Sequence, residues 1–264
     1  MKWQYRLVLL CSALALLLPA RSQQARADVR EFVRADAAPR AYRELTAAYD
    51  ATVVPQLIEI LNSPTEKATH ARAAALLGAV GDERATDALI AFVERPVDNM
   101  RLTVEEEAGQ RWAIISLGYL VNRNGSERAL KYLTEGLTPG VWRQRGVGGM
   151  PDWANSYDQY DLERSKHALF ALALSGHSAA GSALRSLRDT PTSAQAQFRT
   201  GLDDTLAQWL EVYDLVAERG LAGMYEYYEA KRLAEGQQFA EEARRIREER
   251  QRAQGAPEAQ NRPQ

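Results

Sequence analysis

The chain has 264 residues, of which 45% are hydrophobic and 26% are charged, and its net charge is −2. This balance is typical of a globular protein that can bury a core, and it lacks the basic excess that favours nucleic acid or an anionic membrane surface as the main partner. A single cysteine, Cys11, excludes a disulfide framework.

Residues 1–22 have the anatomy of a secretory signal peptide. Two basic residues precede an apolar run from Leu7 to Leu18, and small-residue cleavage sites end at Ser22 and at Ala27. We therefore expect cleavage between residues 22 and 27. The alternative is an uncleaved membrane anchor, but this run is shorter than the roughly 17 to 25 residues that span a bilayer.

Cleavage would change both the cysteine content and the charge of the chain. It removes Cys11 and three basic residues but no acid, which leaves 30 basic and 35 acidic residues and a net charge of −5. A chain without cysteine suits an oxidising compartment if a packed core supplies its stability. We expect a periplasmic or secreted protein of a Gram-negative bacterium, without membrane insertion after the signal is removed.

The first segments of the expected mature chain predict helices. Residues 28–50 indicate a polar helix that caps the N-terminal end of the following domain. Residues 52–63 have apolar side chains at helical spacing, among them Leu57 and Leu61, and Pro55 falls in the first turn, where its missing N–H costs little.

Three later segments have the same organisation, and they run from His70 to Glu94, from Gln110 to Glu135 and from Ser165 to Asp189. Each contains an apolar helical run, a turn with glycine and a second helix with its own apolar face. The residues placed to cap the second helices are Asp82, Ser126 and Ser178.

Small residues recur at one position in the first helix of each unit. Leu77-Gly78 aligns with Leu117-Gly118 and with Leu172-Ala173. Small residues at such positions allow neighbouring helices to approach closely, so we expect helix contacts there.

These segments resemble the HEAT-like repeats, including those first noted in phycobilin lyases. The resemblance covers residues 51–190 and is carried best by VVPQLIEILNS, ARAAALLGAVGDERATDALIAFVE and ERALKYLTEGL. It implies an all-α protein, a right-handed α-solenoid in which the units stack because none can bury its apolar face alone. It also implies a lyase or chaperone role, but the shared residues are structural ones.

The C-terminal third predicts two further kinds of helix. Residues 201–220 have a strong amphipathic pattern and complete a repeat domain that spans 51–220. Residues 221–253 are charged with sparse apolar positions and predict an extended, projecting helix without a coiled-coil seam. The last residues, 254–264, have the composition of a disordered tail.

The residue types that carry metal or catalytic chemistry are scattered. The histidines His70, His167 and His177 lack a His-Glu pair, and no G-x-S-x-G nucleophile motif occurs. Gly146–Gly149 lacks the following Lys-Ser/Thr of a phosphate loop. We therefore expect no catalytic residue, no metal ligand and no cofactor.

One segment is not explained by the repeats, the inserted loop 139–161, which includes VGGMPDWANSYDQYD. Long ordered loops in compact domains tend to be functional. Its acids fit a calcium loop poorly, and we interpret Asp161 as the cap of the next helix. The expected partner-binding residues are the aromatic residues and the methionine near this loop, Trp142, Met150, Trp153, Tyr157 and Tyr160. Alternatively, one or two of them pack between repeats and fix the loop.

These observations predict an exported, non-enzymatic scaffold or adaptor that binds a protein or a peptide. Two alternatives remain open at this stage. One is a small-ligand-binding or lyase-like accessory protein, and the other is a subunit of a cell-envelope assembly.

Overall fold

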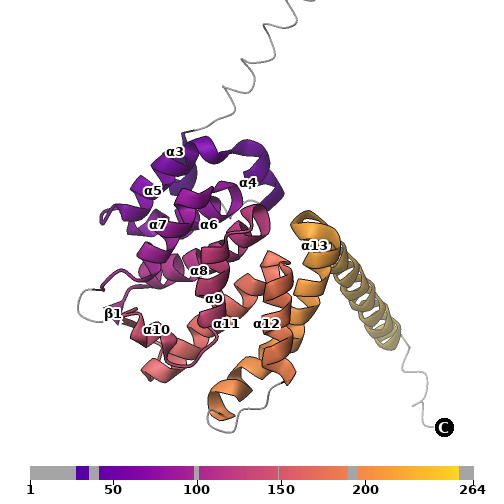
Figure 1. The fold of residues 1–264 in the computed structure, drawn as a ribbon. Coiled ribbons are helices and arrows are strands. Elements are labelled where there is room, and N and C mark those ends of the chain that lie inside the picture. Colours follow the sequence, from indigo (N-terminus) through magenta and orange to yellow (C-terminus); the bar gives the residue numbers. More distant parts are fainter. Residues whose placement is uncertain (1–27, 36–41, 98–100, 148, 190–195, 256–264) are drawn as a thin grey trace, which may run out of the picture. The chain divides into compact units, whose positions relative to one another are not determined.

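The computed structural model describes residues 28–35, 42–97, 101–147, 149–189 and 196–255 (Figure 1). The predicted signal peptide and the tail from residue 256 onward lie outside these ranges. The chain divides between Glu218 and Arg219 into two compact units.

The described residues confirm the predicted all-α class. In chain order, the helices are α3 (Val29–Arg34), α4 (Tyr42–Ala48), the 3-10 turn η1 (Ala51–Val53), α5 (Val54–Asn62), the 3-10 turn η2 (Lys67–Thr69), α6 (His70–Val80), α7 (Glu83–Val93), α8 (Val104–Asn124), α9 (Glu127–Glu135), α10 (Val141–Gln144), α11 (Tyr157–Ser175), α12 (Ser178–Asp189) and α13 (Ala196–Gly255). The described strands are β1 (Arg101–Leu102) and β2 (Met150–Pro151), which form one short parallel ribbon.

The three repeat units form two layers within the first compact unit (Figure 1). The first helices α6, α8 and α11 pack side by side, and α8 contacts both of its neighbours. The second helices α7, α9 and α12 lie in the other layer, where α5 packs against α7. Each unit thus covers the apolar face of the next, as HEAT-like repeats require.

The recurring small residues lie where the first helices approach most closely. A Cβ added to Gly78 in α6 would lie 2.7 Å from the Cβ of Ser116 in α8, and one added to Gly118 would lie 2.1 Å from the carbonyl oxygen of Ala171 in α11. Ser116 and Ala171 occupy equivalent places, each two residues before the aligned small position of its own helix. The predicted register is therefore confirmed by a repeated contact.

Two of the three predicted helix caps are confirmed. The side chain of Asp82 accepts a hydrogen bond from the Arg84 N–H, and that of Ser126 accepts one from the Ala129 N–H. The third prediction was wrong, because Ser178 is already the first residue of α12. His177 precedes it, and its Nδ1 accepts a hydrogen bond from the Ala179 N–H at 3.3 Å.

The N-terminal range holds two short helices where one polar capping helix was predicted. Val29 and Val33 on α3 are buried, so an apolar side of this helix packs onto the array. The ring of Phe32 contacts that of Tyr49 after α4, with ring centroids 5.2 Å apart. Residues 36–41 lie outside the described ranges.

The part of α13 up to Glu218 closes the C-terminal end of the array. Its predicted apolar face is buried at Leu206, Leu210, Tyr213 and Val216. Tyr213 reaches α12 at Gly181, where an added Cβ would lie 2.3 Å from the ring. At Gly220 the backbone leaves the helical conformation, with φ 69° and ψ 174°.

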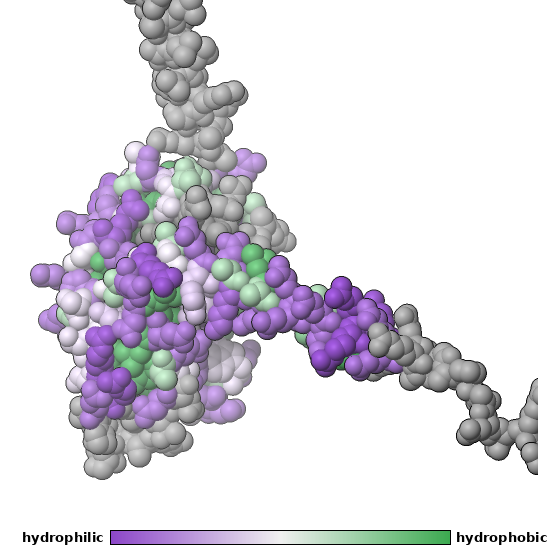
Figure 2. Space-filling model, turned by 90° about the vertical axis from the view of Figure 1, so that its right-hand side faces the viewer, coloured by the Kyte–Doolittle hydropathy of each residue, from purple (hydrophilic) through white to green (hydrophobic). Residues whose placement is uncertain are grey.

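The second compact unit is the long charged helix that the sequence predicted. Apolar residues such as Leu233 and Phe239 are exposed, and the helix surface is mostly hydrophilic (Figure 2). Ion pairs between neighbouring turns support it, among them Arg245 with Glu242 at 2.8 Å. Among all helices that the structure describes, none is long and apolar enough to cross a membrane.

Candidate partner-binding site

The inserted loop is held by another inter-unit linker. Strand β1 lies in the linker between the first two units, and it pairs with β2 of the insertion in the register Arg101 to Met150. Leu102, Ala154 and Tyr160 form a small apolar cluster between these linkers, and Val97 and Met150 pack against it. The two linkers therefore build an ordered layer at the edge where α8 and α11 begin.

Helix α11 begins at Tyr157, earlier than predicted from the sequence. Its cap is Ser156, whose Oγ accepts from the Gln159 N–H at 3.2 Å, while the Gln159 side chain accepts from the Asn155 N–H at 2.8 Å. The interpretation of Asp161 as the cap was wrong. Asp161 is buried inside α11, and its carboxylate accepts a hydrogen bond from the Gly140 N–H at 2.7 Å. Burial raises the pKa of Asp161, and the hydrogen bond from Gly140 opposes this shift.

Trp142 anchors the start of the insertion and is fully buried. Its indole N–H donates to the carbonyl of Gly136 at 3.0 Å and contacts the Oγ of Ser165 at 3.1 Å. The Ser165 hydroxyl itself donates to Gly136 at 2.8 Å. A Cβ on Gly136 would lie 2.6 Å from the Trp142 ring, so this residue has to be small. Trp142 thus lies inside the protein, where a partner cannot contact it.

Two arginines fix the rest of the insertion, the half-buried Arg145 and the buried Arg164, and neither was predicted from the sequence. Arg145 lies over the ring of Tyr132, and Arg164 lies over the ring of Tyr160, each 3.9 Å from the ring centroid. Arg164 donates to the carbonyls of Val147 and Gly149 in the insertion, at 3.4 Å and 3.3 Å. Burial raises the pKa of the Tyr160 hydroxyl to about 12.

The second arm of Arg164 connects the insertion to the preceding unit. Its Nη2 donates to the Oε1 of Gln110 in α8 at 3.3 Å, and Gln110 donates to the carbonyl of Val93 at the end of α7. Burial lowers the pKa of Arg164, since the charged form loses its water. The signal in the sequence is the position of Arg164 on the apolar side of α11.

Of the five predicted partner-binding residues, two are well exposed. Trp153 is 49% exposed and Tyr157 is 36% exposed, whereas Trp142 and Tyr160 are buried and Met150 is half-buried. We call Trp153 and Tyr157 the aromatic platform.

The aromatic platform packs on a buried ring, and ion pairs lie on both sides of it. The Trp153 ring meets the buried Tyr160 ring edge-on, with centroids 5.7 Å apart. Arg143 lies over the Tyr157 ring at 5.7 Å and pairs with Asp158 at 2.5 Å. On the other side, Arg101 of β1 pairs with Asp152 at 2.5 Å. These flanking charges cancel.

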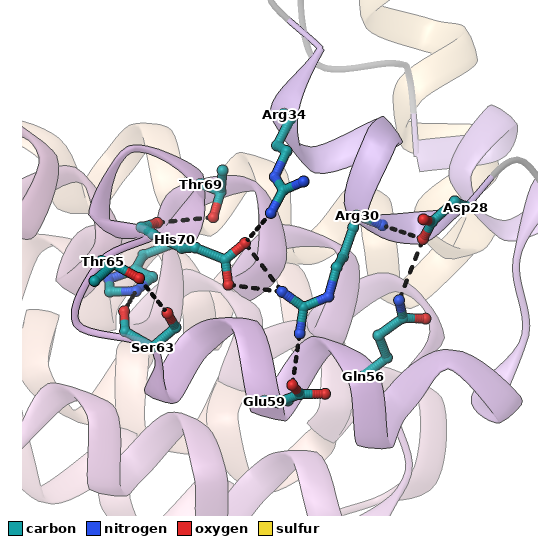
Figure 3. A network of polar contacts seen from close by, with 10 residues as sticks. Asp28, Arg30, Arg34, Gln56, Glu59, Ser63, Thr65, Thr69 and His70 are labelled. Carbon is teal, nitrogen blue, oxygen red and sulfur yellow. Dashed lines mark hydrogen bonds and ion pairs between the residues drawn. The ribbon is translucent and has the colours of Figure 1, made fainter.

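A second polar cluster joins α3 to α5 and η2 (Figure 3). Arg30 pairs with Glu59 at 2.7 Å and with Glu66 at 2.9 Å, and Arg34 pairs with Glu66 at 2.7 Å. The hydrogen bond from Arg34 is the largest cause that lowers the pKa of Glu66. Each of these charges has a partner, so we interpret the cluster as ion pairs that hold α3 against α5 and η2.

The three histidines have structural positions. The Nε2 of His70 lies 2.9 Å from the carbonyl of Ser63 (Figure 3), His177 caps α12, and His167 is half-buried on α11. Within the described part of the chain, no group of three or more His, Cys, Asp or Glu side chains is arranged to hold a metal ion.

The burial of His167 should make the free energy of unfolding depend on pH. Burial and the nearby Arg111, Arg164 and Lys166 lower its pKa to about 4, against an ordinary value near 6.5. Between these two pH values the unfolded chain binds a proton that the folded chain does not. The free energy of unfolding should therefore fall by about 2 kcal/mol as the pH drops from about 6.5 to about 4.

The measurement is urea unfolding as a function of pH, on the wild type and on His167→Leu. Two other buried groups also make the free energy of unfolding depend on pH. Burial lowers the pKa of His70, so its effect has the same sign as that of His167. Burial raises the pKa of Asp161, so its effect has the opposite sign. Both are present in each protein, so the difference isolates His167. Equal pH slopes for the two proteins would contradict the prediction.

Comparison with known families agrees with this architecture. The family model described as PBS lyase HEAT-like repeat matches residues 70–95, which correspond to α6, α7 and the following turn. Residues 70–95 are thus similar to the HEAT-like repeat of PBS lyases. No curated protein and no solved structure matches the chain.

Proposed function

We propose that this HEAT-like repeat protein is an exported, non-enzymatic scaffold that binds a protein or peptide partner through the aromatic platform. The observation that carries the proposal is the exposure of Trp153 and Tyr157 on a layer that is otherwise firmly anchored. A platform fixed in advance loses little conformational entropy when a partner binds.

The chemistry of the aromatic platform favours an apolar or aromatic contact. Large aromatic side chains dominate binding hot spots. The charges beside them, Arg143 with Asp158 and Arg101 with Asp152, form neutral pairs. These pairs suit the polar rim of an interface and offer no excess charge for a strongly charged partner.

The test is partner recovery from a cell-envelope extract, with the full chain as bait. The variant Trp153→Ala/Tyr157→Ala should recover the partner with at least about tenfold lower yield, because hot-spot truncation costs roughly 2 kcal/mol or more. Circular dichroism should show unchanged helix content, since both side chains are exposed.

Tyr227→Ala is the matched control, because Tyr227 is 37% exposed on the second unit and Tyr157 is 36% exposed on the first. Its yield should equal that of the wild type. Equal recovery by the double variant and the wild type would refute the role of the aromatic platform. A loss confined to Tyr227→Ala would favour the alternative, an envelope subunit that docks through its C-terminal helix.

A further inference from the structure

A small cleft lies on the same edge of the array, separate from the aromatic platform. It has a volume of about 40 Å³, which is room for about three water molecules. Its lining comes from η2, the start of α6, the end of α7, the first linker and α8, and consists of Lys67, His70, Phe92, Arg95, Pro96, Val97, Leu102, Glu106 and Gln110.

One wall of the cleft is aromatic and firmly packed. The rings of His70 and Phe92 meet edge-on with centroids 5.1 Å apart. Both lie close to Gly109 of α8, where an added Cβ would be 3.0 Å from the Phe92 ring and 3.3 Å from the Cβ of His70. Together with Val97 and Leu102, the Phe92 ring gives the cleft an apolar side.

The polar part of the cleft has an excess of positive charge. Lys67 and Arg95 are the cations of the lining, and Glu106 is its one carboxylate. Glu106 accepts from Lys67 at 2.8 Å and from the backbone N–H of Thr103 at 2.9 Å. Burial lowers the pKa of His70, which keeps this ring neutral. The lining therefore carries a net charge of +1.

Arg95 has hydrogen-bonding capacity that the described residues do not use. Its guanidinium lies 4.7 Å from the Phe92 ring centroid. Its Nη2 donates to the carbonyl of Leu61 at 2.9 Å and to the Oδ1 of Asn62 at 3.3 Å. Within the described ranges, Nη1 and Nε have no hydrogen-bond partner. Burial also lowers the pKa of Arg95, so an anion that replaced the lost water would be stabilised.

We propose that this cleft binds a carboxylate attached to a small aliphatic group, with Arg95 as its main hydrogen-bond donor. Nε and Nη1 lie on different edges of the guanidinium, so either one can donate a single charge-assisted hydrogen bond to a carboxylate oxygen. The aliphatic group would contact Phe92, Val97 and Leu102 on the apolar side. Such a carboxylate is found at the C-terminus of a peptide and in a free short-chain acid. The proposal does not depend on the aromatic platform.

Isothermal titration calorimetry on the full chain tests it with three probes. These are acetyl-Ala-Val with a free C-terminal carboxylate, the same peptide as its amide, and butyrate. We expect the free-acid peptide to bind at least about tenfold more tightly than the amide. In Arg95→Gln, which keeps one amide donor for Leu61, binding of the acid should fall at least about tenfold.

Arg101→Gln is the matched control, because Arg101 lies on the same linker but is exposed and paired with Asp152. Arg101→Gln should bind the free-acid peptide as tightly as the wild type does. Trp153→Ala should do so too, because Trp153 does not line the cleft. If the peptide fails to bind, the cleft proposal fails and the proposed role of the aromatic platform is unaffected. Lys67→Met serves as a second variant, with an expected severalfold loss, if Arg95→Gln does not fold. Binding of butyrate alone supports a site for free acids. Absence of saturable binding by both acids, or equal binding of acid and amide, overturns the proposal.

Discussion

Replacing Gly118 by alanine should lower the free energy of unfolding by about 3 kcal/mol, and replacing it by valine should prevent the array from folding. The added Cβ would lie 2.1 Å from the carbonyl oxygen of Ala171 and 2.7 Å from its Cα. These are backbone atoms, so no side-chain rotation relieves the clash and α8 must move away from α11. That contact joins two consecutive repeat units.

Urea unfolding followed by tryptophan fluorescence measures this effect, since Trp112, Trp142, Trp153 and Trp209 all lie in the first compact unit. Gly236→Ala is the matched control. An added Cβ there meets no atom within 4 Å, and the exposed helix should gain up to about 1 kcal/mol locally. An unchanged unfolding midpoint for Gly118→Ala would show that the first helices do not pack this closely.

Replacing Arg164 by methionine should cost about 2 to 4 kcal/mol and release the insertion from the array. Methionine roughly preserves the volume but removes the donors to Val147, Gly149 and Gln110. Three buried acceptors would lose that donor in a site that is closed to water. The Tyr160 ring would also lose the cation above it.

Hydrogen exchange locates the effect of Arg164→Met within the chain. Amides of residues 139–156 should exchange much faster, whereas those of α6 and α8 should remain protected, because the repeat contacts are unchanged. The control is Arg143→Met, whose exposed pair with Asp158 contributes about 0.5 kcal/mol or less. Protection of the insertion equal to that in the wild type would mean that Arg164 does not anchor it.

The repeat architecture was predictable because its signals are local and recur along the chain. The alignment of Gly78 with Gly118, and the caps Asp82 and Ser126, depend on residues within one helix or one turn. The same pattern appears in consecutive units, so each instance supports the others. The cap of α12 was missed because histidine is an uncommon cap, and an adjacent serine competed for the position.

The site was predictable only in part, because its order depends on contacts between distant segments. The ribbon joins residues about fifty positions apart, and the hydrogen bond from Arg164 to Gln110 spans 54 positions. The composition of the loop indicated aromatic contact residues. It did not indicate that Trp142 and Tyr160 are buried while Trp153 and Tyr157 are exposed. A two-residue ribbon has no periodicity that a sequence pattern can reveal.

These contacts give the insertion two distinct roles. Its buried residues, with Arg145 and Arg164, fix the linkers to the array. Its exposed residues, Trp153 and Tyr157, are then held in place above this layer. Changes to the first group should lower stability and changes to the second should lower partner recovery, so the two roles can be separated by experiment.

The most direct test of the aromatic platform is site-specific photo-crosslinking in living cells. A photoreactive phenylalanine analogue is placed at Trp153 and, as a control, at the exposed Arg128 on α9. The proposed function predicts a discrete crosslinked adduct from position 153 that is absent from position 128. No adduct from position 153, or the same adducts from both positions, would contradict it.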